Sequence, residues 1–231
     1  MSLELLDKID EGVPITNNGV YKLFISEPES PYLVLLDIGF AQSSTKTITI
    51  RSNYIIDNQT ELDLILHFGA TNSVTVLQPN QKYFIPIPYL VNQSFTLSTS
   101  SNSSTQSNPI TFFQPAKTPS CTVSSNQQHI VVSYEQNNLD QVIVLSPPLI
   151  IENLLPIDIE YSFINLLAPS TLRTDCSCPI YVDTTPLAIQ LQVNAEHFNK
   201  SKVIELNFKA TTEVVSLHIY GQTFSHLSLI I

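Results

Sequence analysis

Apolar and polar residues alternate in short runs along most of this chain. The run at residues 46–51, KTITIR, places an apolar side chain at every second position, which is typical of a strand with one buried face. The runs at 61–68, ELDLILHF, and at 156–163, PIDIEYSF, alternate in the same way. Bends are predicted at Ser-Asn 52–53 and at Pro-Pro 147–148. Short strands at this spacing predict a sandwich of antiparallel sheets.

Two stretches of the chain, residues 45–68 and 140–163, resemble each other at a constant spacing of 95 residues and align without a gap. Each contains an apolar strand, then an Asn, an Asp and a Phe, in the same order and at the same intervals. Alternation alone does not place these three residues in one register, so we interpret the stretches as two copies of one structural unit. The identical pairs are Ile48/Ile143, Ile55/Ile150, Ile56/Ile151, Asn58/Asn153, Asp63/Asp158 and Phe68/Phe163.

The repeat divides the chain into units. We predict a first β-sandwich repeat at residues 1–120 and a second at 121–215. Residues 216–231 are either the opening strands of a third repeat or a strand that completes the second. The polar run at 98–108, STSSNSSTQSN, is predicted to be a solvated loop because it is too polar to bury.

The composition favours strands over helices. Val, Ile, Thr, Tyr and Phe are abundant, and the 231 residues include 15 Pro but only 5 Gly. Turns are predicted at residues 79–80 and near 174–175, and only residues 2–9 and 195–199 favour a turn or two of helix. The predicted fold class is therefore all-β, with tandem antiparallel β-sandwich repeats and minimal helix.

Asn58 and Asn153 each follow an apolar strand at the same position of the repeat. An Asn side chain has two donors and two acceptors to satisfy, and at the end of a buried strand it can bond the backbone of a crossing loop. The alternative is an Asx turn at the surface. Because both copies keep the Asn in one register, we favour a structural clamp.

The net charge and the absence of known catalytic motifs argue against several classes of function. The net charge is −10 and the ten basic residues are scattered, which argues against binding nucleic acid and against direct electrostatic binding to anionic lipids. A Gly-rich phosphate loop and a G-x-S-x-G elbow are both absent from the sequence. We therefore predict a protein that is not an enzyme and has no cofactor.

The remaining candidate groups have simpler interpretations. Cys176 and Cys178 could supply two thiolates, but no second Cys or His pair has the spacing that a zinc site needs. Asp63 and Asp158 occupy equivalent positions in different units, so they are not expected to form a catalytic pair. Three cysteines and an N-terminus without a secretory pattern favour a cytosolic compartment.

The segment 146–163, SPPLIIENLLPIDIEYSF, resembles the adaptor-binding (VAB, or SHR-binding) domain of the vacuolar protein sorting-associated protein 13 family of lipid-transfer proteins. That domain is an array of β-sandwich repeats, each with a characteristic Asn after an apolar strand. Asn153 in IIENLLP matches this position, and Asn58 in IIDNQT matches it also. About two repeats are covered.

The resemblance implies a protein-binding scaffold that recognises short proline-containing motifs, of a Pro-x-Pro type, in membrane adaptor proteins. It further implies a cytoplasmic protein that is peripheral at organelle membranes or contact sites, with an indirect membrane association and a part in lipid and protein transport. Asn58 and Asn153 would then be structural clamps or lie near the adaptor groove.

The alternative function is a carbohydrate- or ligand-binding β-sandwich. Such a module needs exposed aromatic platforms, whereas Trp is absent and Tyr54, Tyr83 and Tyr89 lie in strand-like patterns. We therefore favour the scaffold.

Overall fold

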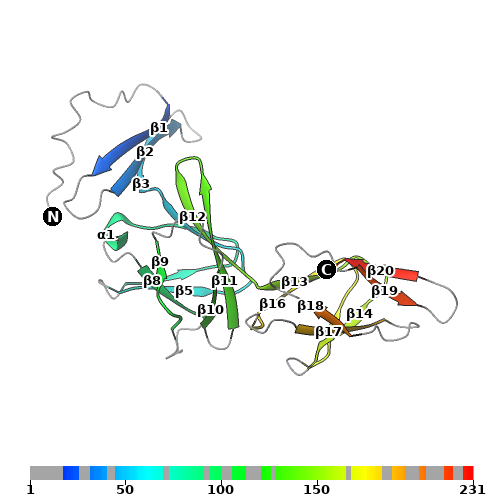
Figure 1. The fold of residues 1–231 in the computed structure, drawn as a ribbon. Coiled ribbons are helices and arrows are strands. Elements are labelled where there is room, and N and C mark those ends of the chain that lie inside the picture. The colour runs from blue at the N-terminus through cyan, green and yellow to red at the C-terminus, as the bar shows by residue number, and fades with distance from the viewer. Residues whose placement is uncertain are drawn as a thin grey trace.

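The computed structural model of the chain is almost entirely β. It describes residues 18–25, 32–40, 45–69, 73–90, 94–99, 106–112, 121–125, 128–164, 168–183, 189–195, 203–206, 216–220 and 226–230. These residues form strands β1 to β20 and one short helix, α1 (Ile87–Leu90), which confirms the predicted fold class (Figure 1). The helical turns predicted at 2–9 and 196–199 lie outside the described residues, and Ala195 ends a strand.

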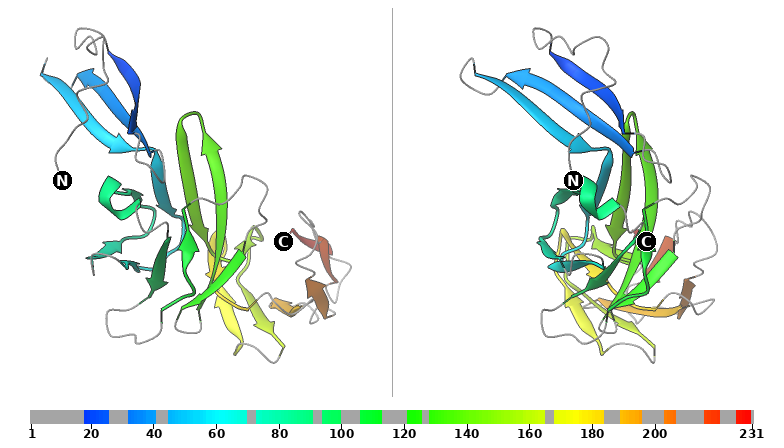
Figure 2. Two further views of the ribbon diagram at one scale, coloured as in Figure 1. Left: turned by 60° about the vertical axis from the view of Figure 1, so that its left-hand side comes forward. Right: turned by 90° about the vertical axis from the view of Figure 1, so that its left-hand side faces the viewer.

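The first three strands form a small antiparallel sheet of their own, the N-terminal sheet, in the order β1-β2-β3. It projects away from the rest of the molecule in two different views (Figures 1 and 2). At Ser52–Asn53 the chain bends, as predicted, and continues into β4. The strands are β1 (Gly19–Ile25), β2 (Tyr32–Phe40) and β3 (Lys46–Ser52).

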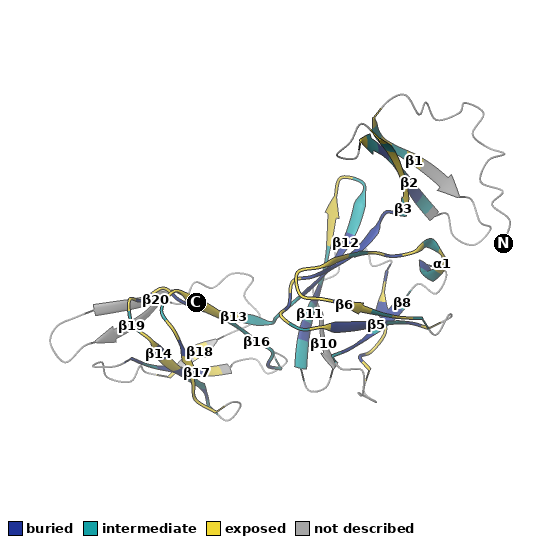
Figure 3. Ribbon diagram, turned by 180° about the vertical axis from the view of Figure 1, so that it is seen from behind, coloured by how far each residue is buried: buried dark blue, intermediate teal, exposed yellow. Residues whose placement is uncertain are grey.

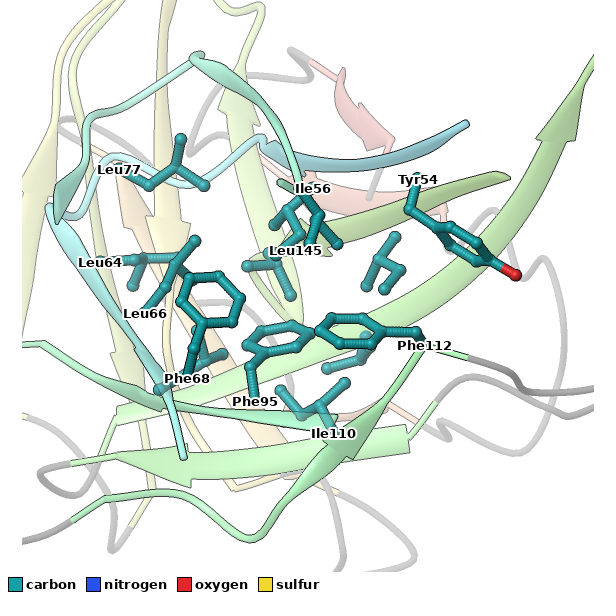
Figure 4. Packing of buried hydrophobic residues seen from close by; sticks show 14 of the residues in the cluster. Tyr54, Ile56, Leu64, Leu66, Phe68, Leu77, Phe95, Ile110, Phe112 and Leu145 are labelled. Carbon is teal, nitrogen blue, oxygen red and sulfur yellow. The ribbon is translucent and has the colours of Figure 1, made fainter. Parts of the chain in front are cut away.

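Two sheets enclose the first core and make the first sandwich. A five-stranded sheet has the order β10-β11-β12-β4-β7, and a four-stranded sheet has the order β6-β5-β8-β9. Aromatic rings fill the space between them: the ring centroids of Phe95 and Phe112 are 5.4 Å apart, and Phe68 lies beside both (Figure 4). The strands are β4 (Tyr54–Asn58), β5 (Leu64–Phe68), β6 (Ser73–Leu77), β7 (Lys82–Phe84), β8 (Ser94–Ser98), β9 (Ile110–Thr111), β10 (Cys121–Ser125), β11 (Gln128–Asn137) and β12 (Asp140–Ser146).

A second sandwich follows, with a separate core. Its sheets are the pair β13-β16 and the four-stranded sheet β15-β14-β17-β18, and residues such as Ile151, Phe163 and Leu191 are buried between them. Strands β19 (Ser216–Tyr220) and β20 (His226–Ile230) pair with each other. The strands of the second sandwich are β13 (Leu149–Asn153), β14 (Ile159–Phe163), β15 (Ser170–Leu172), β16 (Cys176–Ile180), β17 (Ile189–Ala195) and β18 (Ile204–Leu206).

The two sandwiches share part of their strand order. The order β6-β5-β8-β9 in the first corresponds to β15-β14-β17-β18 in the second, and the antiparallel pair β4-β7 corresponds to β13-β16. The turns predicted at 79–80 and 174–175 are present, and Asn80 and Asp175 both take positive φ, at 57° and 53°. These two residues are again 95 positions apart.

The first core is closed by strands from the second copy of the sequence repeat. Strand β12 pairs in parallel with β4, from Gln141 opposite Tyr54 to Leu145 opposite Asn58. The core includes Ile130, Val132, Ile143 and Leu145, which all lie beyond residue 120. The division at residue 120 follows the sequence repeat and stays a prediction, as does the role of 216–231.

The ends of the polar run 98–108 differ from the predicted solvated loop. Ser98 and Ser107 are both buried. The Ser107 hydroxyl oxygen accepts a hydrogen bond from the Leu97 N–H at 2.9 Å, and the Ser107 N–H donates to the Leu97 carbonyl at 2.8 Å. The hydroxyl and backbone groups of Ser107 thus bond to the backbone of β8. A serine-rich segment can therefore be buried at its ends, because its polar groups find partners there.

Candidate functional site

Asn58 ends β4 and is fully buried. Its Nδ2 donates to the carbonyls of Leu62, Leu77 and Gln78 at 2.9, 3.1 and 3.0 Å. Its Oδ1 accepts from the N–H and the hydroxyl of Thr60 at 3.0 and 2.6 Å. One side chain thereby ties the end of β4, the loop that follows it and the end of β6 together.

Asn153 makes three of the corresponding contacts in the second sandwich. It ends β13, is fully buried, and its Nδ2 donates to the carbonyls of Ile157 and Leu172 at 2.9 and 3.1 Å. Its Oδ1 accepts from the Leu155 N–H at 3.1 Å. These three partners are the repeat equivalents of Leu62, Leu77 and Thr60. The structure thus places both asparagines at corresponding strand ends, each bonded to backbone.

The loop after Asn58 also contacts residues from the second copy of the sequence repeat. The Glu61 N–H donates to the Tyr181 hydroxyl at 2.9 Å, and the Gln59 N–H donates to the Leu145 carbonyl at 2.8 Å. Burial raises the pKa of Tyr181 above its usual value. The Tyr181 carbonyl in turn accepts from the His129 N–H at 3.3 Å. The first asparagine therefore lies close to a junction where segments from both copies meet.

Residues 13–231 match the family described as vacuolar-sorting associated protein 13, adaptor binding domain. The chain belongs to this family. The match spans nearly all of the sequence, and it agrees with the resemblance carried by Asn58 and Asn153. No curated protein matches the chain.

An adaptor-binding domain is a protein-binding module, so its exposed strand edges are the surfaces of interest. Strand β6 is an edge of its sheet, and Val74 and Val76 on it are 57% and 55% exposed. Figure 3 shows this strand exposed beside the buried β5. The equivalent positions in the second copy are Pro169, just before β15, and Thr171 on β15, and both are exposed. The two copies therefore differ at this edge, with apolar valines in the first and a proline and a threonine in the second.

The segment PIP at 86–88 is not a strand in the adaptor-binding domain. Pro88 lies in the first turn of α1, and the Tyr89 N–H donates to the Pro86 carbonyl at 2.9 Å. Tyr83 and Tyr89 are packed against the first core and Tyr54 is buried within it. These three rings consequently do not offer the exposed platforms that carbohydrate binding would need.

The groups considered for chemistry are exposed or hydrogen-bonded to neighbouring groups. Cys176 is exposed, and Cys178 accepts a hydrogen bond from the Tyr161 hydroxyl at 3.4 Å. Asp158 accepts from the Thr174 N–H at 2.9 Å, which stabilises the β15–β16 turn, and Asp63 is exposed in the other sandwich. Within the described ranges, no three His, Cys, Asp or Glu side chains are grouped as a metal site would require.

Sequence reasoning missed two features of this region. Tyr181 lies outside the repeat motif, and nothing in its local sequence indicates a contact 120 residues away. Val74 and Val76 could have been found, because a comparison of the two copies at this edge shows Pro and Thr where the first copy has Val.

Among the described residues, no helix has the length and apolar character that crossing a membrane requires.

Proposed function

We propose that this adaptor-binding domain holds short proline-containing segments of membrane adaptor proteins, and thereby helps to recruit a large lipid-transfer protein to organelle membranes. The family match supports a protein-binding module. Its cytoplasmic, peripheral location follows from the same proposal, because contact with the membrane would run through the adaptor.

We choose β6 as the peptide-binding surface because its edge is exposed. An extended peptide can add to an open sheet edge through backbone hydrogen bonds, while side chains on the edge strand give it specificity. Edge strands are usually guarded by Pro, Lys or a covering loop. The edge beside β15 has Pro169, whereas β6 presents Val74 and Val76. An apolar edge of this kind is suited to a partner strand.

The geometry of a strand also explains why a Pro-x-Pro segment suits such an edge. Residues i and i+2 of a strand point their N–H groups to the same side. Both prolines, which lack an N–H, can therefore face away from β6 while the residue between them donates to it. The proline rings are pre-set for an extended backbone, so less conformational entropy is lost on binding.

The test is peptide binding by the whole chain, measured by fluorescence polarisation with a labelled Pro-x-Pro peptide and an Ala-x-Ala control. We expect Val74→Lys and Val76→Lys each to weaken binding at least tenfold, which is about 1.4 kcal/mol. Both side chains are already exposed, so the fold should tolerate the change.

Thr171→Lys is the matched control, because Thr171 is exposed at the equivalent position of the other copy. It should bind the peptide as the unmodified chain does. Equal binding by the valine variants would reject the β6 surface, and equal binding of both peptides would reject proline recognition itself.

A further inference from the structure

Hydrogen bonds at β8 show which way the backbone groups of its sheet point. The Leu97 N–H donates to the Ser107 hydroxyl, and the Leu97 carbonyl accepts from the Ser107 N–H, so neither group bonds β5. In an antiparallel pair, opposite residues either bond each other or both point away, and the two kinds of pair alternate. Leu66 of β5 lies opposite Leu97, so its backbone groups point to the other side, towards β6.

The same alternation determines which residues of β6 face its open edge. Thr75 lies opposite Leu66 and therefore turns its backbone groups towards β5. Its neighbours Val74 and Val76 turn theirs to the other side. Among the described strands, none pairs with β6 on that side. Two residues thus offer N–H and carbonyl groups to an added strand, and both carry exposed apolar side chains.

The second copy differs from the first in the backbone of this edge as well as in its side chains. Pro169 stands at the repeat position of Val74, and proline has no N–H. An added strand would therefore lose one of its hydrogen bonds at the second copy. This difference concerns a donor of the backbone, so it can be tested apart from the side chains.

Tyr83 lies beside the same edge, on the inner side of the sheet. It stands opposite Ile56, a residue of the first core, and its half-buried ring packs against that core with its centroid 6.1 Å from that of Phe68. The Thr75 hydroxyl donates to the Tyr83 hydroxyl at 3.5 Å, so the phenol reaches from β7 to β6. The edge therefore has an outer side formed by two valines and an inner side formed by Thr75 and Tyr83. In the second copy, Cys178 stands at the position of Tyr83.

We propose that Tyr83 is the residue that distinguishes proline in the adaptor segment, an inference that rests on the proposed binding to β6. A strand added antiparallel to β6, the slightly more stable pairing, has its hydrogen-bonding residue opposite Val74 or Val76. In a Pro-x-Pro segment this is the middle residue, because it alone has an N–H. In either register one of the two prolines lies opposite Thr75, on the inner side, and its ring packs against the phenol of Tyr83. Aromatic side chains are the usual partners of proline rings in peptide grooves.

Two proline substitutions in the 231-residue chain test the orientation of β6. Val74→Pro removes an N–H that faces the open edge, so the urea midpoint should change little while the labelled Pro-x-Pro peptide binds at least tenfold more weakly. Thr75→Pro removes an N–H that bonds β5, so the urea midpoint should fall. A midpoint for Val74→Pro as low as that of Thr75→Pro, or an unchanged midpoint for Thr75→Pro, would overturn the orientation and with it the placement of the proline.

Substitutions of Tyr83 test the contact with proline by fluorescence polarisation. Tyr83→Phe keeps the ring and should bind the Pro-x-Pro peptide as the unmodified chain does. Tyr83→Ala should weaken that binding at least fivefold and change binding of the Ala-x-Ala peptide little, so that the preference between the two peptides shrinks. Nuclear Overhauser effects between the proline ring protons and the Tyr83 ring should report the same contact in the unmodified chain, where folding is not in question.

The outcomes separate this inference from the proposed function. A preference for Pro-x-Pro that Tyr83→Ala leaves intact would overturn the role of Tyr83 while β6 remains the binding surface. Contacts of Tyr83 with the middle residue of the peptide, as a parallel strand would give, would also overturn it. If the unmodified chain does not bind the Pro-x-Pro peptide, the proposed function and this inference are both rejected.

Discussion

The strand-end asparagines show how one side chain can determine a local fold. Asn58 and Asn153 each satisfy carbonyls from two segments with Nδ2 and a backbone N–H with Oδ1, in a fully buried site. Buried polar groups that lose their partners are costly, so an apolar residue of similar size cannot replace the amide. Whether either residue also lies beside an adaptor groove stays a prediction.

Asn153→Ile should therefore destabilise the second sandwich. The substitution leaves the Leu172 carbonyl and the Leu155 N–H buried without partners, at about 1–3 kcal/mol each. We expect the free energy of unfolding to fall by about 3 kcal/mol, measured by urea denaturation. Asn108→Ile, at an exposed position, is the control and should have little effect. An unchanged urea midpoint for Asn153→Ile would contradict the proposed clamp role of Asn153.

Two buried tyrosines make stability depend on pH in the alkaline range. Burial raises the pKa of Tyr54 to about 12. The pKa of Tyr161 is also raised to about 12, mainly by burial and further by its hydrogen bond to Cys178. The folded state therefore retains these protons between pH 10 and 12, whereas the unfolded state releases them from pH 10 upward. The stability is full below pH 10 and falls as the pH rises towards 12.

We expect the urea midpoint to decline between pH 10 and 12, and tyrosinate absorbance to show that Tyr54 and Tyr161 ionise late. Tyr161→Phe should flatten part of this decline, because Phe has no proton to release. A midpoint that falls equally steeply in the variant would show that other groups cause the pH dependence.

At the scale of elements, an ion pair joins the N-terminal sheet to the first sandwich. Arg51 at the end of β3 bonds Asp140 at the start of β12, with its two guanidinium nitrogens 2.6 and 3.3 Å from the carboxylate oxygens. The guanidinium also lies 5.0 Å from the centre of the Phe84 ring. Because the pair is partly buried and bidentate, it should hold the bend at Asn53 in one geometry.

Asp140→Asn should weaken this contact and lower the free energy of unfolding by about 2 kcal/mol. Hydrogen exchange should become faster at the end of β3 while β5 stays protected. Lys82→Gln is the control: its ammonium is 3.5 Å from Asp57 but mostly exposed, so its loss should cost less than about 1 kcal/mol. Equal effects of the two substitutions would contradict a special role for Arg51 and Asp140.

The elements were partly predictable from the sequence. Alternation and turn residues placed β3, β5 and the turns at 79–80 and 174–175, because these features depend on neighbouring residues. The parallel pairing of β12 with β4 was not predicted, because pairing between distant strands leaves no trace in local alternation. Helix α1 was missed as well, since PIPY continues an apolar run that favours a strand.

Some residues of the candidate site could also be predicted from the sequence, and others could not. Asn58 and Asn153 were found because the repeat presents them twice, whereas the contact of Tyr181 with Glu61 depends on tertiary packing. Burial of Ser107 was also unpredictable, because its hydroxyl is satisfied by a strand ten residues away.

At the scale of the whole molecule, the boundaries of the sequence repeat and of the packed sandwich do not coincide. The repeat suggests a boundary at residue 120, but the first core draws on Ile130, Val132, Ile143 and Leu145, which are all buried. A fragment that ends at residue 120 would lose these side chains and expose the inner face of β5 and β8. Burying each of them contributes about 1.5–3 kcal/mol, which together is comparable to the stability of a whole domain.

We therefore expect a fragment of residues 1–120 to be unfolded or molten, and a fragment of residues 1–147, which keeps β10, β11 and β12, to fold cooperatively. Circular dichroism and the dispersion of amide proton signals in NMR spectra distinguish these states. Leu145→Lys in the longer fragment is the matched control, because it places a charge in the core and should unfold the first sandwich although it lies in the second copy of the repeat. If residues 1–120 fold cooperatively alone, β11 and β12 are an accessory to the first sandwich, and the boundary at residue 120 describes the folding unit as well as the repeat.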